Sequence, residues 1–190
     1  PNGSGGVVGQ ENGIGKGSPL RSALEAKGRP SFVRWGPPGS GKTTIARLVA
    51  GEVGAAFEPL SAVTAGVKDV REVIRRAAER ATPTVLFVDE IHRFNKAQQD
   101  AFLDAVERGA ITLVGATTEN PSFEVNNALL SRCRVVPLQP LPPEAVARVV
   151  RAALSDSERG LGVRGLRIED AAVERIVALA GGDARRALGC

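Results

Sequence analysis

One eight-residue segment constrains the fold of this chain more than any other feature. Residues 36–43 read Gly-Pro-Pro-Gly-Ser-Gly-Lys-Thr and fill every fixed position of the phosphate-binding pattern G-x-x-x-x-G-K-[S/T]. Its glycines let successive backbone N–H groups point inward, which forms a nest for nucleotide phosphates. Lys42 is expected to place its charge on the β and γ oxygens, and the Thr43 hydroxyl to ligate Mg²⁺. The nucleotide is expected to contact Gly36, Pro37, Pro38, Gly39, Ser40, Gly41, Lys42, Thr43 and Thr44.

The residues on either side of this loop have the character that the motif needs. Residues 31–35 are typical of a short strand, and residues 45–50 are typical of a helix. The helix adds the positive end of its dipole to an anion site, which argues against a glycine-rich turn that contains Lys-Thr by chance. Arg34 is unusual because a buried parallel strand is nearly all apolar. We expect it to snorkel to solvent or to lie at the end of the strand.

Composition indicates a soluble protein without a membrane partner. Hydrophobic residues make up 43% of the 190 residues, and no apolar run approaches the roughly 18 residues of a membrane span. Residues 1–17 do not resemble a signal peptide, and Cys133 and Cys190 are too few for a disulfide framework, so we expect a cytoplasmic location. The sequence holds no Met, so we expect the chain to begin through processing, cloning or truncation. The net charge of +4 permits nucleic-acid binding without requiring it.

Strands and helices alternate along the first part of the chain. This alternation predicts an α/β domain with a mainly parallel sheet. Together with the phosphate loop, it indicates a P-loop NTPase fold, a three-layer αβα sandwich with a five-stranded parallel sheet, followed by a partial helical lid. The expected strands are 31–35, 55–60, 84–89, 110–116 and 134–138.

Two helices of this domain carry readable patterns. One has an apolar face made by Val70, Val73, Ile74, Ala77, Ala78 and Ala81. Its opposite face carries Arg71, Arg75, Arg76 and Arg80, which we interpret as solvated arginines. Glu72 and Glu79 are their expected partners. The second helix spans 95–108, with Asn95 as N-cap and Gln98 in capping-box register.

A proline-rich passage at 137–143 predicts a linker and a domain boundary. We expect an α/β domain over 1–139 and a helical lid subdomain over 140–190. Apolar residues keep helical spacing over 146–154 and again over 173–180, before a glycine stop signal. So few helices are not expected to close a core of their own. They would pack on the sheet domain, on a missing segment or on another subunit.

A second nucleotide motif lies at 84–90, where an apolar strand ends in two carboxylates. Asp89 can hold the Mg²⁺, and Glu90 can orient and deprotonate the attacking water. Two surface carboxylates at a strand end are the alternative. The fourth strand runs into Thr117 and Thr118, where a polar side chain would lie beside the γ-phosphate. Either threonine could instead cap the following turn.

These motifs and their surroundings resemble one family. The chain is similar to the AAA+ ATPases, and within them to the RarA (MgsA) family of replication-associated recombination proteins. The resemblance rests on residues 35–39, 87–100 and 115–123, continues through 129–134, and covers most of the chain from Val8 to Leu188. The run after Asp89 is its most specific part.

The resemblance implies roles for further residues. Val8 and Gly9 match the box near the adenine, although residues 1–6 lack the stretch expected before it. Thr118 matches the first sensor, with Thr117 as the alternative. Arg132 matches an arginine finger that reaches the γ-phosphate of a neighbouring subunit. Arg185 matches the second sensor, in preference to Arg186. The expected catalytic set is therefore Glu90, Lys42, Thr118, Arg132 and Arg185.

The family also implies a biological role. It predicts a Mg²⁺-dependent ATPase that binds ATP and ADP and acts on DNA forks, ends or gaps, close to the nucleoid. A homo-oligomer and single-strand-binding or replisome partners are further implications. The family continues beyond Cys190 into the rest of the lid and an oligomerisation region, so this chain is expected to remain a monomer. A clamp-loader subunit and a nucleotide switch without turnover are the alternatives. His92 is interpreted as structural or as part of a DNA-sensing surface, because Glu90 already supplies a base.

Overall fold

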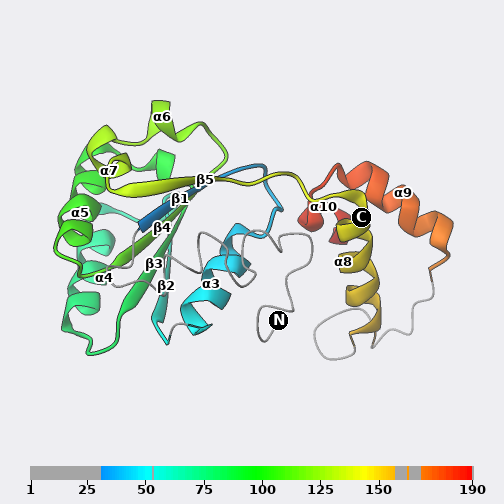
Figure 1. The fold of residues 1–190 in the computed structure, drawn as a ribbon, viewed down its shortest axis with the longest axis horizontal. Coiled ribbons are helices and arrows are strands. Elements are labelled where there is room, and N and C mark those ends of the chain that lie inside the picture. The colour runs from blue at the N-terminus through cyan, green and yellow to red at the C-terminus, as the bar shows by residue number, and fades with distance from the viewer. Residues whose placement is uncertain (1–30, 53, 157–161, 163–167, 190) are drawn as a thin grey trace.

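The computed structural model describes residues 31–52, 54–156, 162 and 168–189. Within this part, one region is built on a sheet and the other is entirely helical, and an extended segment after the last strand joins them (Figure 1). The expected contacts of Val8 and Gly9 lie outside the described residues.

The sheet has five parallel strands in the order β2-β3-β4-β1-β5. Their bounds are Ser31–Trp35 for β1, Ala56–Ser61 for β2, Thr84–Asp89 for β3, Thr112–Thr117 for β4 and Cys133–Pro137 for β5. The predicted five-stranded parallel sheet is confirmed. β1 lies between β4 and β5, so the phosphate loop that follows it leaves the sheet next to the carboxyl end of β4.

Three strands begin one or two residues away from the predicted positions, for local reasons. The Ala55 N–H donates to the Ala50 carbonyl at 2.9 Å, so this residue closes the preceding helix and β2 starts after it. The Ala110 N–H likewise donates to the Ala105 carbonyl at 3.0 Å, so β4 begins only at Thr112. β5 begins one residue early because Cys133 pairs with Ser31.

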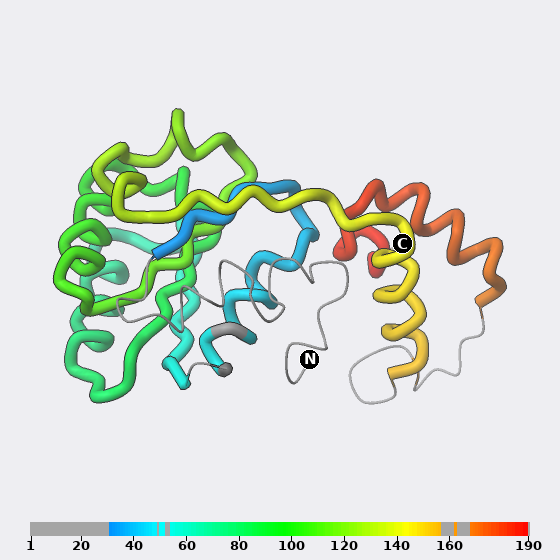
Figure 2. The backbone as a smooth tube through the Cα atoms, in the orientation of Figure 1, coloured from blue at the N-terminus to red at the C-terminus, as the bar shows by residue number. Residues whose placement is uncertain are grey.

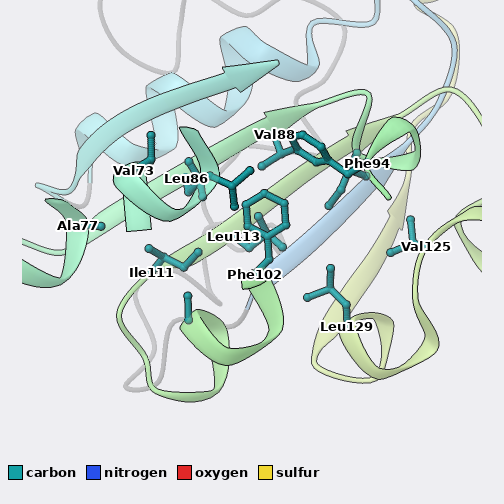
Figure 3. Close-up of a cluster of buried hydrophobic side chains, with 13 residues drawn as sticks. Val73, Ala77, Leu86, Val88, Phe94, Phe102, Ile111, Leu113, Val125 and Leu129 are labelled. Carbon is teal, nitrogen blue, oxygen red and sulfur yellow. The ribbon is translucent and has the colours of Figure 1, made fainter. Parts of the chain in front are cut away.

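Helices cover both faces of the sheet, which gives three layers. Helix α3, Lys42–Glu52, packs on one face over a cluster that includes Phe32, Phe87 and Val114. Helices α4 and α5, Val67–Glu79 and Lys96–Glu107, pack on the other face, where Phe102 of α5 joins Leu86 and Leu113 of the sheet in one buried cluster (Figure 3). Short helices η2, α6 and α7 follow β3 and β4 at Ile91–Arg93, Pro121–Glu124 and Asn127–Leu130. The three-layer αβα arrangement matches the prediction.

Helix α4 differs from its predicted pattern at its C-terminal end. Val70, Val73 and Ala77 are buried, whereas Ala78 is exposed within the helix and Ala81 is exposed beyond its end at Glu79. Of its arginines, Arg75 has the expected partners, Glu72 at 2.7 Å and Glu79 at 2.6 Å. Arg76 and Arg80 contact Glu58 of β2. In helix α5 the predicted capping box is present, with Asn95 as N-cap and Gln98 as its partner.

Arg34 does not snorkel and does not lie at the strand end. Its side chain is fully buried, and its backbone in β1 pairs with Ala116 of β4 on one side and Val136 of β5 on the other. None of its guanidinium nitrogens has a hydrogen-bond partner among the described residues. Burial lowers the pKa of Arg34 to about 10, because removing the guanidinium from water disfavours its charge. The prediction for this residue is wrong, because the folded protein leaves none of the Arg34 side chain exposed to solvent.

The described part of the helical region has three helices, α8 at Pro143–Ser155, α9 at Asp170–Ala180 and α10 at Ala184–Leu188 (Figure 2). They enclose a small cluster of their own, made by Leu141, Ala145, Val146, Val150, Val173, Ala180 and Ala187. This corrects the expectation that so few helices would not close a core of their own, because the short α10 contacts both longer helices. The expected packing on the sheet domain is present, since the Ala184 N–H donates to the Gly39 carbonyl of the phosphate loop at 3.3 Å. Gly181 ends α9 with φ +58°, a left-handed conformation that glycine adopts without strain.

Candidate nucleotide site

The phosphate loop lies between β1 and α3 and is held by its own hydrogen bonds. Lys42 Nζ donates to the carbonyls of Gly36 and Pro37 at 2.9 and 2.8 Å, and Ser40 Oγ donates to Pro37 at 2.9 Å. Gly41 has φ +81°, which an L side chain rarely adopts. The lysine is therefore positioned inside the loop, where incoming phosphate oxygens can replace its carbonyl partners.

The electrostatics around Lys42 place four other charged groups near it. Its pKa is lowered, mainly because the ammonium is largely removed from water. The carboxylates of Asp89 and Glu90 raise it, and the guanidinium groups of Arg185 and Arg34 lower it. Charged groups from the end of β3, from β1 and from the lid thus interact electrostatically with the lysine of the phosphate loop.

A cavity of about 240 Å³ opens at this edge of the sheet. It is lined by Pro38, Gly39, Gly41, Lys42, Thr43, Thr44, Asp89, Glu90, Thr118, Ala184, Arg185 and Leu188. We call it the nucleotide pocket. Gly36, Pro37 and Ser40 do not line it, but Gly36 and Pro37 hold the lysine from behind.

The two carboxylates reach the pocket because β3 ends there. Asp89 is the last residue of β3, and Glu90 follows it with φ 54° and ψ 45°. Glu90 is the one non-glycine residue with positive φ in the described part of the chain. Such a conformation costs about 1–3 kcal/mol and is concentrated at functional sites. The Glu90 residue lines the pocket, and its Oε2 lies 3.4 Å from His92 Nε2 and 3.9 Å from Arg93 Nε.

The pocket offers a cation few protein ligands. Thr43 and Asp89 both line it, as the predicted metal ligands. The described residues contain no group of three or more His, Cys, Asp or Glu side chains that could hold a metal ion. This fits Mg²⁺, which is usually bound by one or two protein groups together with water and substrate phosphates.

The structure separates the two threonines at the end of β4. Thr118 lines the nucleotide pocket. Thr117 is fully buried, and its hydroxyl contacts His92 Nδ1 at 2.9 Å and accepts from the Glu119 N–H at 3.0 Å. Thr118 can therefore meet a phosphate, whereas Thr117 connects the strand end to His92 and the following turn.

The lid closes the pocket through the start of α10. Asp183 is the N-cap of this helix, and its Oδ1 accepts from the N–H groups of Arg185 and Arg186 at 2.8 and 3.0 Å. A Cβ at Gly39 would lie 1.6 Å from that oxygen, and the Ala184 N–H donates to the Gly39 carbonyl at 3.3 Å. Sequence reasoning did not assign a role to Asp183. An aspartate just before a short helix was the available signal.

Arg132 is not part of the nucleotide pocket. It follows α7, is half exposed, and forms an ion pair with Glu107 at the end of α5. Its guanidinium also donates to the Ala128 carbonyl at 3.0 Å and to Ser131 Oγ at 2.9 Å.

The neighbouring Cys133 is not a reactive thiolate, because burial raises the pKa of its thiol to about 12.

Comparison with known proteins agrees with this geometry. The model of the family described as ATPase family associated with various cellular activities (AAA) matches residues 32–141, more than half of the chain. The chain belongs to the AAA family. This AAA module is 53% identical to replication-associated recombination protein A of Coxiella burnetii over 95% of the chain and 41% of that protein. It is 50% identical to the Escherichia coli K12 protein of the same name, again over 95% of the chain and 41% of the relative.

Solved structures share the fold of this AAA module. The Thermotoga maritima RuvB Holliday junction branch migration motor has a TM-score of 0.80 and 30% identity, and the comparison covers the whole chain and 62% of RuvB. The chain is thus an AAA ATPase module homologous to replication-associated recombination protein A, and it spans about two fifths of the length of the curated relatives it matches. Among the described residues, no helix is both long and apolar enough to cross a membrane.

Proposed function

We propose that this module hydrolyses ATP with Mg²⁺ as part of a DNA-associated protein that maintains or recombines replication forks. One observation carries the hydrolysis: Lys42, Asp89 and Glu90 meet in one pocket. A phosphate-binding lysine and a metal-binding aspartate suffice for a nucleotide switch, and the adjoining glutamate adds a base for water attack.

Each pocket residue has a distinct task in this proposal. The loop amides and Lys42 hold the β and γ phosphates, and Thr43 and Asp89 are the protein ligands of the metal ion. Bound Mg²⁺ would neutralise charge on the transferring phosphoryl group. Glu90 orients the water and accepts its proton, and Thr118 holds that water or the γ-phosphate. Arg185 brings a second cation from the lid. Val8 and Gly9 remain the proposed adenine contacts.

A further charge comes from a neighbouring subunit. Arg132 does not line its own nucleotide pocket, and its side chain is exposed enough to meet another chain. An arginine supplied in trans makes hydrolysis depend on assembly. The proposed full-length protein is therefore a homo-oligomer, whereas the present α/β domain and lid, divided near residue 140, bind the nucleotide.

The DNA association rests on the relatives. Their names refer to replication-associated recombination, and RuvB is named as a Holliday junction branch migration motor. We infer a cytoplasmic protein that works on forked, gapped or single-stranded DNA, with single-strand-binding or replisome proteins as partners. DNA should accelerate its ATP turnover.

Two substitutions test the proposed hydrolysis. Lys42→Ala should weaken ATP binding by the 190-residue chain beyond calorimetric detection, because the phosphates lose their cation. Glu90→Gln keeps nearly the same shape and should bind ATP normally, while full-length protein carrying it loses at least about 100-fold in turnover. Normal steady-state turnover in Glu90→Gln protein would rule out Glu90 as the base.

A further inference from the structure

Arg132 follows a very short helix, so its position depends on what holds that helix in place. Helix α7 spans only Asn127–Leu130 and lies beside α5 (Figure 1). A helix of one turn is not stable through its own hydrogen bonds and needs contacts with the rest of the protein. The fully buried Leu129 supplies one such contact, in the cluster that also contains Phe102 of α5. Polar contacts gather at Asn126, the residue just before the helix.

Asn126 is held by three hydrogen bonds. Its backbone N–H donates to Gln99 Oε1 at 2.7 Å, and its side-chain Nδ2 donates to Asp100 Oδ1 at 2.8 Å. Its Oδ1 accepts from the Ala128 N–H at 2.8 Å and thereby caps α7. Both ends of the side-chain amide meet the partner they need, because a carboxylate only accepts and a backbone N–H only donates. Gln99 is itself buried, and its Nε2 donates to the Phe94 carbonyl at 2.9 Å, so this anchor belongs to the interior of the domain.

The contacts of Asn126 lead directly to Arg132. The N–H of Ala128 is capped by Asn126, and the carbonyl of Ala128 accepts from the Arg132 guanidinium at 3.0 Å. At one end of this segment, Asn126 contacts Asp100 of α5. At the other end, Arg132 contacts Glu107, which lies about 10 Å further along the same helix. The segment that ends in Arg132 is thus attached to α5 at both ends.

The two attachments differ in strength. Asn126 has a buried partner in Gln99 and a backbone cap. The side chains of Arg132 and Glu107 are 44% and 43% exposed, and such an ion pair is easily exchanged for another anion. The start of α7 can therefore stay in place while the arginine leaves Glu107 for a neighbouring chain.

We propose that Asn126 is the positioning residue for the arginine that acts in trans: it fixes the start of α7 so that Arg132 meets the nucleotide pocket of the neighbouring subunit. This inference rests on the proposed function. Asn126 does not line the nucleotide pocket of its own chain, so loosening it leaves that pocket intact. It spreads Arg132 over more positions, and the transferring phosphoryl group of the neighbour then lacks a preorganised cation.

Asn126→Asp tests this role with a minimal change of shape. Aspartate keeps the cap of α7 but cannot donate to Asp100, and it places two carboxylates side by side. In full-length protein kcat should fall about 10- to 100-fold, with KM for ATP within about twofold. Calorimetry should find unchanged ATP affinity in the isolated chain. The matched control is Asn127→Asp, which adds the same charge at the next, exposed position and should leave kcat near the wild-type value.

Two rescues separate positioning from a general loss of structure. Asp100→Asn in the Asn126→Asp background reverses donor and acceptor, so the pair forms again and most of the kcat should return. Verified mixed assemblies with Lys42→Ala subunits should also regain turnover, because an intact pocket beside Asp100 and Asn126 variants of this kind again meets an intact Arg132 from the Lys42→Ala subunit.

The outcomes distinguish this inference from the function on which it rests. If Arg132→Ala lowers kcat and Asn126→Asp does not, the role of Asn126 is overturned, and the failure of either rescue overturns it as well. Wild-type protein without ATP turnover, or Arg132→Ala protein with normal turnover, would instead remove the proposed function and this inference with it.

Discussion

The nucleotide pocket and the surface around Arg132 use charged groups in opposite ways. In the pocket, Lys42 and Glu90 are held at the place where they are needed, by loop carbonyls and by a left-handed backbone. On the surface, Arg132 lies outside the lining of that pocket and is paired with Glu107 of its own chain. Lys42, Glu90 and Arg132 all belong to the α/β domain.

The difference shows which part of the chemistry a single chain can complete. Groups that bind the nucleotide are preorganised, so binding requires little rearrangement. The cation that would serve the neighbour's phosphates is kept on the surface by a half-exposed ion pair, which is weak and easily exchanged. We therefore expect the isolated chain to bind the nucleotide, and only the assembled protein to hydrolyse it at the full rate.

The largest predicted effect separates these two regions by turnover. Arg132→Ala should lower ATP turnover of the assembled protein about 1,000-fold, because the transition state loses a cation supplied in trans. ATP affinity of the isolated chain, measured by calorimetry, should remain unchanged. Arg134→Ala is the matched control, since Arg134 is exposed and only two residues away.

Mixing variants tests whether the arginine acts between chains. An Arg132→Ala subunit with an intact pocket should regain turnover beside a Lys42→Ala subunit with an intact arginine. Verified mixed assemblies without any recovered turnover would mean that the arginine acts within its own chain.

The second prediction concerns the closure of the pocket by the lid. Gly39→Ala should weaken ATP binding about tenfold, because its Cβ would displace Asp183 and thereby α10 and Arg185. Gly109→Ala is a control for backbone strain alone, since Gly109 has φ +68° with open space around its Cβ position. Both variants should lose about 1 kcal/mol of stability in thermal unfolding.

A second substitution can remove the clash at Gly39. Asp183→Ala in the Gly39→Ala background should restore part of the ATP affinity, because the nearest atoms to the new Cβ belong to the Asp183 side chain. If affinity stays low in the double variant, the loss comes from the loop itself and the lid contact is unimportant.

Much of the fold and the inner part of the site could be predicted because both follow from local patterns. Strand and helix periodicity indicated the parallel sheet, and the two nucleotide motifs indicated the residues that the structure brings together at its edge. Strand ends were off by one or two residues, since hydrogen bonds such as that from Ala110 to Ala105 decide them.

Features that depend on distant segments could not be predicted. The contact of Gly39 with Asp183 joins the loop to the far end of the chain, and the pairing of Arg132 with Glu107 joins α7 to α5. The complete burial of Arg34 depends on strands that neighbour β1 only in the folded sheet. A linear pattern carries no signal for such pairs, because they form only when the strands and helices have assembled.

The smallest predicted effect tests whether Glu107 restrains Arg132. Glu107→Gln removes the carboxylate partner while keeping the shape of the side chain, so more subunits present a free guanidinium to their neighbours. Turnover at saturating ATP should rise about two- to fivefold, as the loss of a weak surface ion pair allows. Asp104→Asn is the matched control, because it removes another exposed ion pair of α5, the 2.9 Å contact with Arg108, without touching Arg132. A fall in turnover with Glu107→Gln, but not with Asp104→Asn, would mean that Glu107 aims the arginine at the neighbouring site rather than holding it back.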